Sequence, residues 1–243
     1  MSLVSIVLPV YNEAENLPVL WAELQPVLAQ LPVTAEVLIV DDGSTDDSAA
    51  IVRAIGHADR RVRLVRLAAN GGLTGALLAG FAAARGDWIV TMDSDLQYDP
   101  ADIPRLLDAL DRYDAALGWR GQRRDTWVKR LSSRIANAVR SAVLGDPVRD
   151  SACTLRAMRR ECLAAIAPYQ GMHRFVPTLL RQAGFLVIEM EVRHRPRRYG
   201  VSKYGIRNRS LRALVDLLAV RWMRARRVAY TIVEDTGKSG PGS

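Results

Sequence analysis

Residues 88–97 are Trp-Ile-Val-Thr-Met-Asp-Ser-Asp-Leu-Gln, an apolar run that ends in two carboxylates. The run 88–92 is typical of a buried strand, and Asp93-Ser94-Asp95 follows where that strand gives way to a loop. Two Asp residues at i and i+2 can direct oxygen ligands into one crevice, where Mg²⁺ or Mn²⁺ would meet diphosphate oxygens. Because solvated acidic loops also contain D-x-D, other features must support this prediction.

Similar apolar runs recur along the first half of the chain, with helical patterns between them. We predict strands at 5–8, 36–40, 62–67, 88–92 and 115–117. We predict helices at 17–31, 47–55, 72–85 and 102–113. This alternation predicts an α/β fold with a mostly parallel central sheet and helices on both faces.

Polar clusters follow the predicted strands, at the end where parallel sheets bind ligands. They are Tyr11-Asn12-Glu13, Asp41-Asp42-Gly43-Ser44, Asn70-Gly71-Gly72 and Asp93-Ser94-Asp95. Tyr11 could lie beside a base, Glu13 and Asp42 could accept hydrogen bonds, and the glycines could let the backbone approach a phosphate. Turns and helix starts also explain each cluster. The patterns of P-loop ATPases and dinucleotide dehydrogenases are missing from these positions.

Charge is distributed unequally along the 243 residues. Residues 1–118 hold 8 Lys and Arg against 17 Asp and Glu, whereas residues 119–243 hold 26 against 9. This asymmetry predicts a half that binds metal and nucleotide, joined to a half that meets anions. A nucleic-acid-binding protein would also explain the basic half, but 6% aromatic residues are few for base stacking. It would leave the acidic loops unexplained, so we expect no nucleic-acid partner.

The chain shows no sequence feature of a membrane-spanning or secreted protein. No apolar stretch approaches the roughly 18–20 residues that a spanning helix needs, and the first residues do not resemble a secretory signal. Cys153 and Cys162 lack metal-ligand spacing and fit a reducing compartment. We therefore expect a cytoplasmic protein that does not cross the membrane.

The second half contains a basic loop and two amphipathic segments. Residues 193–205 are rich in Arg, Pro and Gly, which suits a loop that closes over phosphates. Segments 125–144 and 206–227 place apolar residues three or four apart among arginines, as in interfacial helices or ordinary packed surface helices. We predict a catalytic domain at 1–205, a membrane-interface helix region at 206–230 and a disordered tail at 231–243.

Three motifs resemble those of the inverting family 2 glycosyltransferases, which have a GT-A fold. They are Val-Leu-Pro-Val-Tyr-Asn-Glu-Ala-Glu-Asn-Leu at 7–17, Val-Asp-Asp-Gly-Ser-Thr-Asp at 40–46 and Met-Asp-Ser-Asp-Leu-Gln at 92–97. The R-x-x-G-x-S-K pattern at 197–203 resembles the polyprenyl-phosphate branch, which includes dolichyl-phosphate mannosyltransferase and bacterial undecaprenyl-phosphate sugar transferases. The likeness runs from about residue 4 to about residue 225.

The resemblance and the residues together predict the site. For the nucleotide we predict Pro9, Tyr11, Glu13, Asp41, Asp42, Gly72, Asp93 and Ser94. For Mg²⁺ or Mn²⁺ we predict Asp93, Asp95 and Gln97. For catalysis we predict Asp95, Arg120, Arg197 and Lys203, and for the acceptor phosphate Arg120, Ser202 and one of Lys129 and Arg130.

The predicted reaction is metal-dependent, inverting sugar transfer from a nucleotide diphosphate sugar to a polyprenyl phosphate, with undecaprenyl phosphate as the expected acceptor. Residues 150–156 depart from the mannosyl pattern toward the bacterial aminoarabinose and glucosyl types, so the sugar and the nucleotide stay open. The alternative is transfer to a hydroxyl of a polysaccharide or glycolipid. We expect a cell-envelope enzyme, peripheral on the anionic inner face of the membrane. Whether the protein also binds a second copy of itself or a membrane-protein partner stays open.

Overall fold

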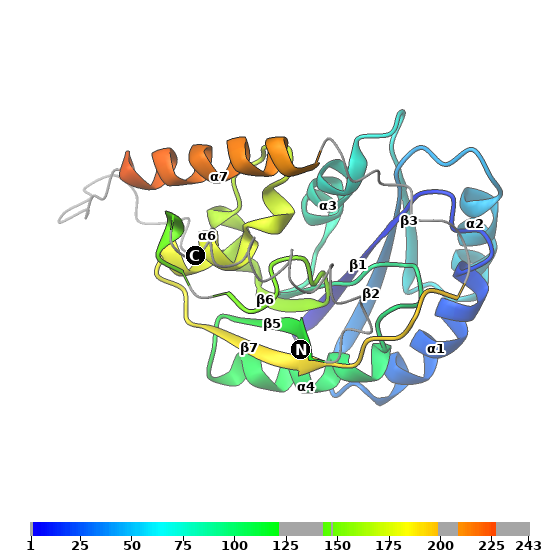
Figure 1. Cartoon of the computed structure of the whole chain (residues 1–243). Helices are drawn as coiled ribbons and strands as arrows, with labels where there is room; N and C mark the ends of the chain where they lie inside the picture. Colours follow the sequence, from blue (N-terminus) through cyan, green and yellow to red (C-terminus); the bar gives the residue numbers. More distant parts are fainter. Residues whose placement is uncertain (1, 122–142, 147, 199–208, 227–243) are drawn as a thin grey trace, which may run out of the picture.

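The computed structural model describes residues 2–121, 143–146, 148–198 and 209–226. In these residues, a seven-stranded sheet has the order β3-β2-β1-β4-β6-β5-β7 (Figure 1). The strands are β1 (Leu3–Val10), β2 (Thr34–Asp41), β3 (Val62–Arg66), β4 (Trp88–Thr91), β5 (Ala115–Arg120), β6 (Arg156–Arg159) and β7 (Val187–Val192). Strands β1 to β4 are parallel, and β5 is parallel to β7, whereas β6 is antiparallel to both of its neighbours.

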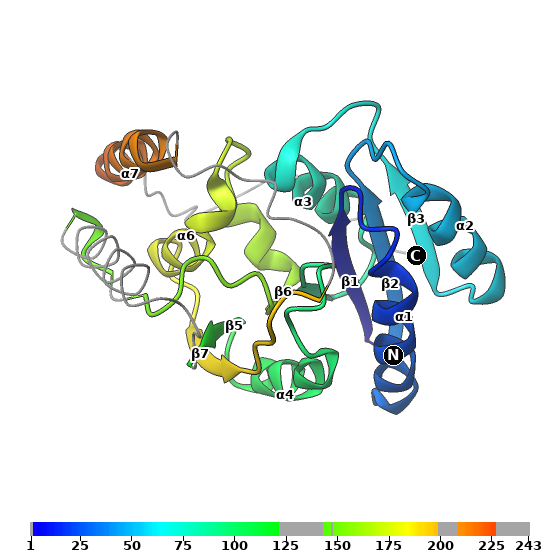
Figure 2. The ribbon, with the colours of Figure 1, turned by 45° about the vertical axis from the view of Figure 1, so that its right-hand side comes forward.

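Helices cover both faces of this sheet (Figure 2). The α-helices are α1 (Leu17–Gln30), α2 (Ser48–Ala58), α3 (Gly72–Ala83), α4 (Ile103–Asp108), α6 (Val176–Gln182) and α7 (Arg209–Ala225). Short 3₁₀ turns lie at Pro100–Asp102, Ala109–Asp111, Arg160–Ala165 and Met172–Arg174. Helices α1, α2 and α4 pack on one face, and α3 and α6 pack on the other.

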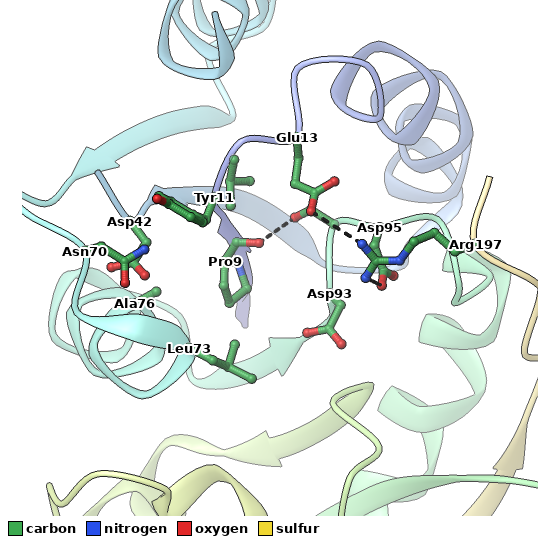
Figure 3. Close-up of a pocket in the computed structure, with 12 residues that line it drawn as sticks. Pro9, Tyr11, Glu13, Asp42, Asn70, Leu73, Ala76, Asp93, Asp95 and Arg197 are labelled. Carbon is green, nitrogen blue, oxygen red and sulfur yellow. Dashed lines mark hydrogen bonds and ion pairs between the residues drawn. The ribbon is translucent and has the colours of Figure 1, made fainter. Parts of the chain in front are cut away.

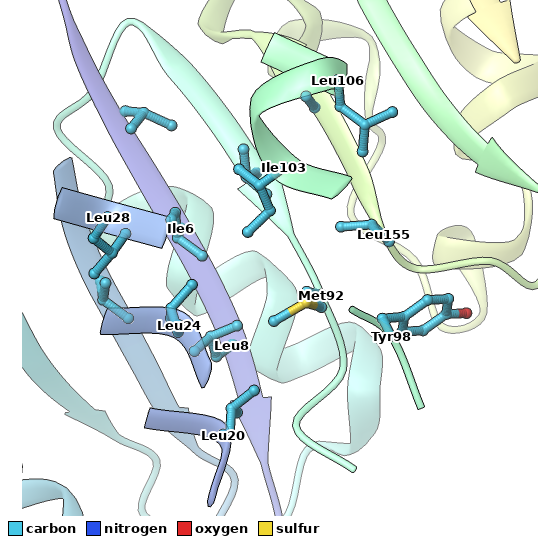
Figure 4. Close-up of a cluster of buried hydrophobic side chains, with 14 of the residues drawn as sticks. Ile6, Leu8, Leu20, Leu24, Leu28, Met92, Tyr98, Ile103, Leu106 and Leu155 are labelled. Carbon is cyan, nitrogen blue, oxygen red and sulfur yellow. The ribbon is translucent and has the colours of Figure 1, made fainter. Parts of the chain in front are cut away.

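Alternation along the central strands builds both layers of the core. Ile6 and Leu8 of β1 belong to the cluster that contains Leu24 of α1 (Figure 4). Val7, between them, belongs to the cluster on the other face, which contains Leu77 of α3. Successive side chains of a strand point to opposite faces, so a strand covered on both sides is apolar along most of its length. The apolar runs in the sequence therefore become the buried centre of the sheet.

Gly80 lets α3 lie close against the central strands. A Cβ at this position would collide with the side chain of Val7 and would lie 3.2 Å from Cγ2 of Val40. The close approach fixes α3 over β1 and β2. The beginning of α3 consequently lies beside the carboxyl ends of these strands, where the polar clusters gather.

The structure confirms the predicted α/β architecture, with a mostly parallel sheet and helices on both faces. Strands β6 and β7 were not predicted, because β6 has only four residues with arginines at both ends, and glutamates interrupt the apolar residues of β7. Helix α7 falls within the predicted range 206–230. Most of the predicted helix 125–144 and the predicted tail 231–243 lie outside the described residues. No helix in the described residues is long and apolar enough to span a membrane.

Candidate functional site

A cavity of about 320 Å³ opens beyond the carboxyl ends of β1, β2 and β4 (Figure 3). It is lined by Pro9, Val10, Tyr11, Glu13, Asp42, Asn70, Leu73, Ala76, Asp93, Ser94, Asp95 and Arg197. Segments that are far apart in sequence thus meet in one place, because parallel strands end at the same edge of the sheet. Ten residues were predicted for the nucleotide or the metal, and seven of them line this cavity: Pro9, Tyr11, Glu13, Asp42, Asp93, Ser94 and Asp95. Asp41, Gly72 and Gln97 do not line it.

The loop after β1 is tied to the loop after β2 by backbone donors. The Asn12 N–H donates to Oγ of Ser44 at 2.9 Å, and the Glu13 N–H donates to Oγ of Ser48 at 3.0 Å. Asn12 has a φ of 53°, a left-handed conformation that Asn adopts more readily than most residues. This turn directs Tyr11 and Glu13 to the cavity wall.

Asp42 connects the end of β2 with the glycine turn that begins α3. Its Oδ1 accepts a hydrogen bond from the Gly71 N–H at 2.7 Å. Burial raises the pKa of Asp42, and the N–H groups of Gly71 and Gly72 oppose that shift by stabilising the carboxylate. Gly72 itself does not line the cavity, although its neighbour Leu73 does.

Asp41, predicted to bind the nucleotide, lies outside the cavity lining. Its Oδ2 pairs with Nε of Arg66 at 3.0 Å, and its Oδ1 accepts from the Ser44 N–H at 2.9 Å. The side chain is fully buried. These contacts correspond to the turn role that the sequence left open for this residue.

The Asp93-Ser94-Asp95 segment carries two carboxylates into the cavity. Ser94 Oγ donates to the Pro9 carbonyl at 2.8 Å, which ties the segment to the end of β1. Burial, together with the negative charge of Asp95, raises the pKa of Asp93 to about 6. The following residue, Leu96, has a φ of 63°, a strained conformation for a buried leucine. Such strain is common where a loop must direct functional groups.

Arg197 places a positive charge on the same wall. Its Nη2 lies 2.6 Å from Oδ2 of Asp95, and its Nη1 lies 4.0 Å from Oε1 of Glu13 (Figure 3). This arginine comes from the segment after β7, about a hundred residues beyond Asp95 in sequence. The structure thus brings one member of the predicted basic loop to the acidic pair.

Asp93 and Asp95 suit a divalent metal because both are oxygen ligands that face one cavity. Burial, and next the charge of Asp95, raises the pKa of Asp93, and a bound cation would relieve the repulsion between the two carboxylates. Arg197 already supplies a cation at Asp95. The Gln97 amide, the third predicted ligand, instead lies 3.5 Å from the Arg195 carbonyl. Among the described residues, no three Asp, Glu, His or Cys gather as a metal cluster.

Arg120 lies at the end of β5, outside the cavity lining. Its Nε and Nη2 bind the two oxygens of Asp150 at 2.6 and 3.0 Å. Burial lowers the pKa of Arg120, but the hydrogen bonds and charge of Asp150 outweigh that effect and raise it. The positive charge of Arg120 also opposes the rise in the pKa of Asp93.

Some residues of the cavity were not predicted from the sequence, and some predicted residues lie outside the part of the chain that the structure describes. Val10, Asn70, Leu73 and Ala76 line the cavity but were not predicted. Asn70 belongs to a polar cluster that the sequence already showed, whereas the two α3 side chains differ in no visible way from core residues. Lys129, Arg130, Ser202 and Lys203 lie outside the described residues, so their roles stay predictions.

The sheet, the cavity at its carboxyl edge and the paired aspartates agree with the predicted class of protein, a glycosyltransferase with a GT-A fold. The glycosyl transferase family 2 model matches residues 5–166, and the chain belongs to this family. The fold is also that of glucosyl-3-phosphoglycerate synthase from Mycobacterium tuberculosis, with a TM-score of 0.65 and 23% identity over 97% of this chain and 82% of that one.

Two curated relatives are more similar in sequence. Undecaprenyl-phosphate 4-deoxy-4-formamido-L-arabinose transferase of Sodalis glossinidius (strain morsitans) is 40% identical over 217 residues, or 88% of this chain and 65% of the relative. Dodecaprenyl-phosphate galacturonate synthase of Rhizobium johnstonii is 37% identical over 224 residues, or 89% of this chain and 65% of the relative. The chain thus spans slightly less than two thirds of either relative.

Proposed function

We propose that this protein transfers a sugar from a nucleotide diphosphate sugar to a polyprenyl phosphate, with inversion at the anomeric carbon. The observation that carries the proposal is the convergence of Tyr11, Glu13 and Asp42 with Asp93 and Asp95 in one cavity. These residues offer a ring and hydrogen-bond acceptors for a nucleoside, beside carboxylates suited to a metal–diphosphate complex.

Asp93 and Asp95 are the residues that would hold Mg²⁺ or Mn²⁺, with Gln97 as the further predicted ligand. Mg²⁺ is commonly bound by one or two carboxylates together with substrate phosphates and water. When bound, the metal would neutralise the charge that develops on the departing diphosphate. Asp93 and Asp95 contribute by holding their oxygens on one wall, and Ser94 fixes the loop through Pro9.

Two observations support a lipid phosphate as the acceptor. The curated relatives described above are named for undecaprenyl and dodecaprenyl phosphate. The cavity also receives Arg197, the first residue of the R-x-x-G-x-S-K pattern. A phosphate acceptor is already an oxyanion at neutral pH, so it requires positioning more than deprotonation. Arg197 would orient the donor diphosphate and the acceptor phosphate despite their repulsion. Arg120, paired with Asp150 outside the cavity lining, would contribute positive charge near Asp93.

The outer face of α7 supports peripheral binding to a membrane that contains the acceptor. Val215, Leu218 and Trp222 are 59%, 53% and 62% exposed, while Leu217 and Val220 on the opposite face are buried. Arg226 lies over the Trp222 ring at 5.8 Å. An exposed apolar stripe with adjacent arginine is typical of helices that lie in the interface of anionic bilayers. We therefore propose attachment to the inner face of the cytoplasmic membrane.

The proposal is tested by offering labelled nucleotide sugars singly with undecaprenyl phosphate, followed by extraction into organic solvent. We expect one labelled sugar to enter the organic phase in the presence of Mg²⁺ or Mn²⁺. Parallel reactions contain a polysaccharide or glycolipid with free hydroxyls. Preference for these acceptors would contradict the lipid-phosphate assignment and favour the hydroxyl-directed alternative.

A further inference from the structure

The segment 193–197, here called the strap, leaves β7 and runs beside the loop that follows Asp95. The Arg195 N–H donates to the Gln97 carbonyl at 2.8 Å, and an isolated antiparallel bridge joins Tyr98 to His194. The rings of Tyr98 and His194 also meet edge to face, with centroids 5.7 Å apart. The strap is therefore held as a short extended segment against residues 97 and 98.

Arginine occupies every second position of the strap, and the first of these arginines is bound through its backbone and its side chain. The Arg193 N–H donates to Oδ2 of Asp102 at 2.7 Å, and its Nη2 lies 3.2 Å from Oδ1 of the same carboxylate. The Arg193 Nη1 lies 3.0 Å from Oδ2 of Asp99. Asp102 is only 4% exposed, so these donors replace the contacts with water that its carboxylate loses on burial.

Arg195, the second strap arginine, joins the same acidic group to helix α1. Its Nη2 lies 2.8 Å from Oδ2 of Asp99, and its Nη1 lies 2.8 Å from Oε2 of Glu23. One oxygen of Asp99 therefore binds both Arg193 and Arg195. The other oxygen accepts from the Ala101 N–H at 3.0 Å, which fixes the carboxylate at the start of a 3₁₀ turn.

Arg197, the third, is the strap arginine that lines the cavity. Its contact with Asp95 would be weak as an isolated ion pair near solvent, because ordering two long side chains costs entropy. The rest of the strap reduces that cost, since its backbone is already fixed two residues earlier. We propose that Asp99 and Asp102 are positioning residues, which hold the strap so that Arg197 reaches the cavity.

The role of Arg197 in sugar transfer rests on the proposed function, whereas the positioning of Arg197 by the strap does not. Neither Asp99 nor Asp102 lines the cavity, and neither needs to contact a substrate. Their expected influence is through Arg197. The sequence gives no direct sign of this role, because Asp99 and Asp102 belong to a loop and a helix start where Asp is ordinary.

The first test is hydrogen exchange of the strap without any ligand. Asp99→Asn preserves the side-chain shape but removes the charge, and we expect the Arg195 amide to exchange on the order of 10-fold faster. The double variant Arg193→Gln, Arg195→Gln changes the more exposed partners of Asp99 and should speed exchange of the same amide. It provides a second test in case Asp99→Asn does not fold. Asp59→Asn is the control, because it removes the distant Arg61 pair. Unchanged strap exchange in both test variants would overturn the proposal.

The second test separates positioning from general stability by a double-mutant cycle. We expect Asp99→Asn to lower kcat/KM for sugar transfer about 10-fold, and to lower it less than about twofold further in an Arg197→Ala background. Effects that multiply in full would show that Asp99 acts independently of Arg197 and would overturn the proposal. If no lipid phosphate is an acceptor, the proposed function fails, whereas strap exchange still decides this inference.

Discussion

The acidic first half and the basic second half of the chain hold their functional residues by different means. Tyr11, Asp42 and Asp93 follow strands of a parallel sheet, whose backbone hydrogen bonds and two-sided core determine where each loop begins. Arg120 ends strand β5 and Arg197 follows β7, but the side chains of both are held by carboxylates, those of Asp150 and Asp95. The residues proposed for the donor are thus positioned mainly by backbone packing, whereas the side chains proposed for the acceptor are positioned by paired charges.

The difference has a physical consequence for how each half responds to its surroundings. Hydrophobic burial is insensitive to moderate salt, whereas partly exposed ion pairs are screened. The donor cavity should therefore keep its shape under conditions that loosen the basic strap. The effects of substitutions should also differ between the two halves. In the first half a substitution would remove a group that binds the ligand from a fixed position, and in the second half it would disturb the orientation of an arginine.

The largest effect is expected where the two halves meet, at Asp95. Asp95→Asn removes a negatively charged ligand and weakens the contact with Arg197, so we expect turnover to fall about 100-fold or more. The matched control is Asp87→Asn, at the opposite end of β4. Turnover is measured across a Mg²⁺ and Mn²⁺ titration. Full activity in excess chelator, with the metal shown to be gone, would refute metal dependence.

The next effect concerns the basic half alone. Arg197→Ala and Lys203→Ala would each remove a proposed charge-assisted contact to phosphate. Such a contact is worth about 1.5–3 kcal/mol, so we expect kcat/KM for transfer to fall about 10- to 100-fold. Donor hydrolysis by water should fall less, because it needs no acceptor phosphate. Arg198→Ala, next to Arg197 but outside the cavity lining, is the control. Unchanged transfer in both variants would contradict the lipid-phosphate acceptor, whereas the assignment to the glycosyltransferases would remain.

The same contrast explains what could be predicted from sequence. Apolar runs with polar residues after them reveal strands and the edge at which they end, so Glu13, Asp42 and Asp93 were found before their positions were known. Asp41 and Asp42 could not be separated in this way, since adjacent residues at a strand end point to opposite sides. One enters a turn with Arg66, and the other enters the cavity.

Positions that depend on pairing in space leave no periodic pattern. The bond between Arg120 and Asp150 joins residues thirty apart, and the strap finds Asp99, Asp102 and Glu23 on different elements. Strand β6 was missed for a related reason: it is short, and arginines stand at both of its ends. The buried Arg156 among them donates to the carbonyls of His173 and Ser151.

A smaller effect tests the packing that positions the donor half. Gly80→Ala would place a methyl group against Val7, and we expect the free energy of unfolding to fall by about 1–3 kcal/mol. Gly75→Ala in the same helix is the control, because no atom lies within 4 Å of its added Cβ. That substitution should be neutral or stabilising by up to about 1 kcal/mol, since Ala favours helix. Denaturant unfolding compares the two; equal losses would show that close approach at Gly80 is unimportant.

The smallest effect tests whether the basic half meets a membrane. Leu218→Ala trims the outer face of α7, and Leu186→Ala trims a leucine of similar exposure before β7; the two are 53% and 62% exposed. We expect only Leu218→Ala to weaken binding to anionic vesicles, by about 1 kcal/mol or roughly fivefold, because only that side chain would enter the interface.

Flotation with phosphatidylglycerol vesicles, compared with neutral vesicles and repeated at raised salt, measures this difference. Binding should favour the anionic vesicles and weaken with salt, since arginines near such a surface contribute about 1 kcal/mol each before screening. Equal losses in the two leucine variants would mean that α7 has no special contact with lipid. The proposed acceptor would then be bound without a membrane-binding helix, and the basic loop that begins with Arg197 would have to provide the attraction.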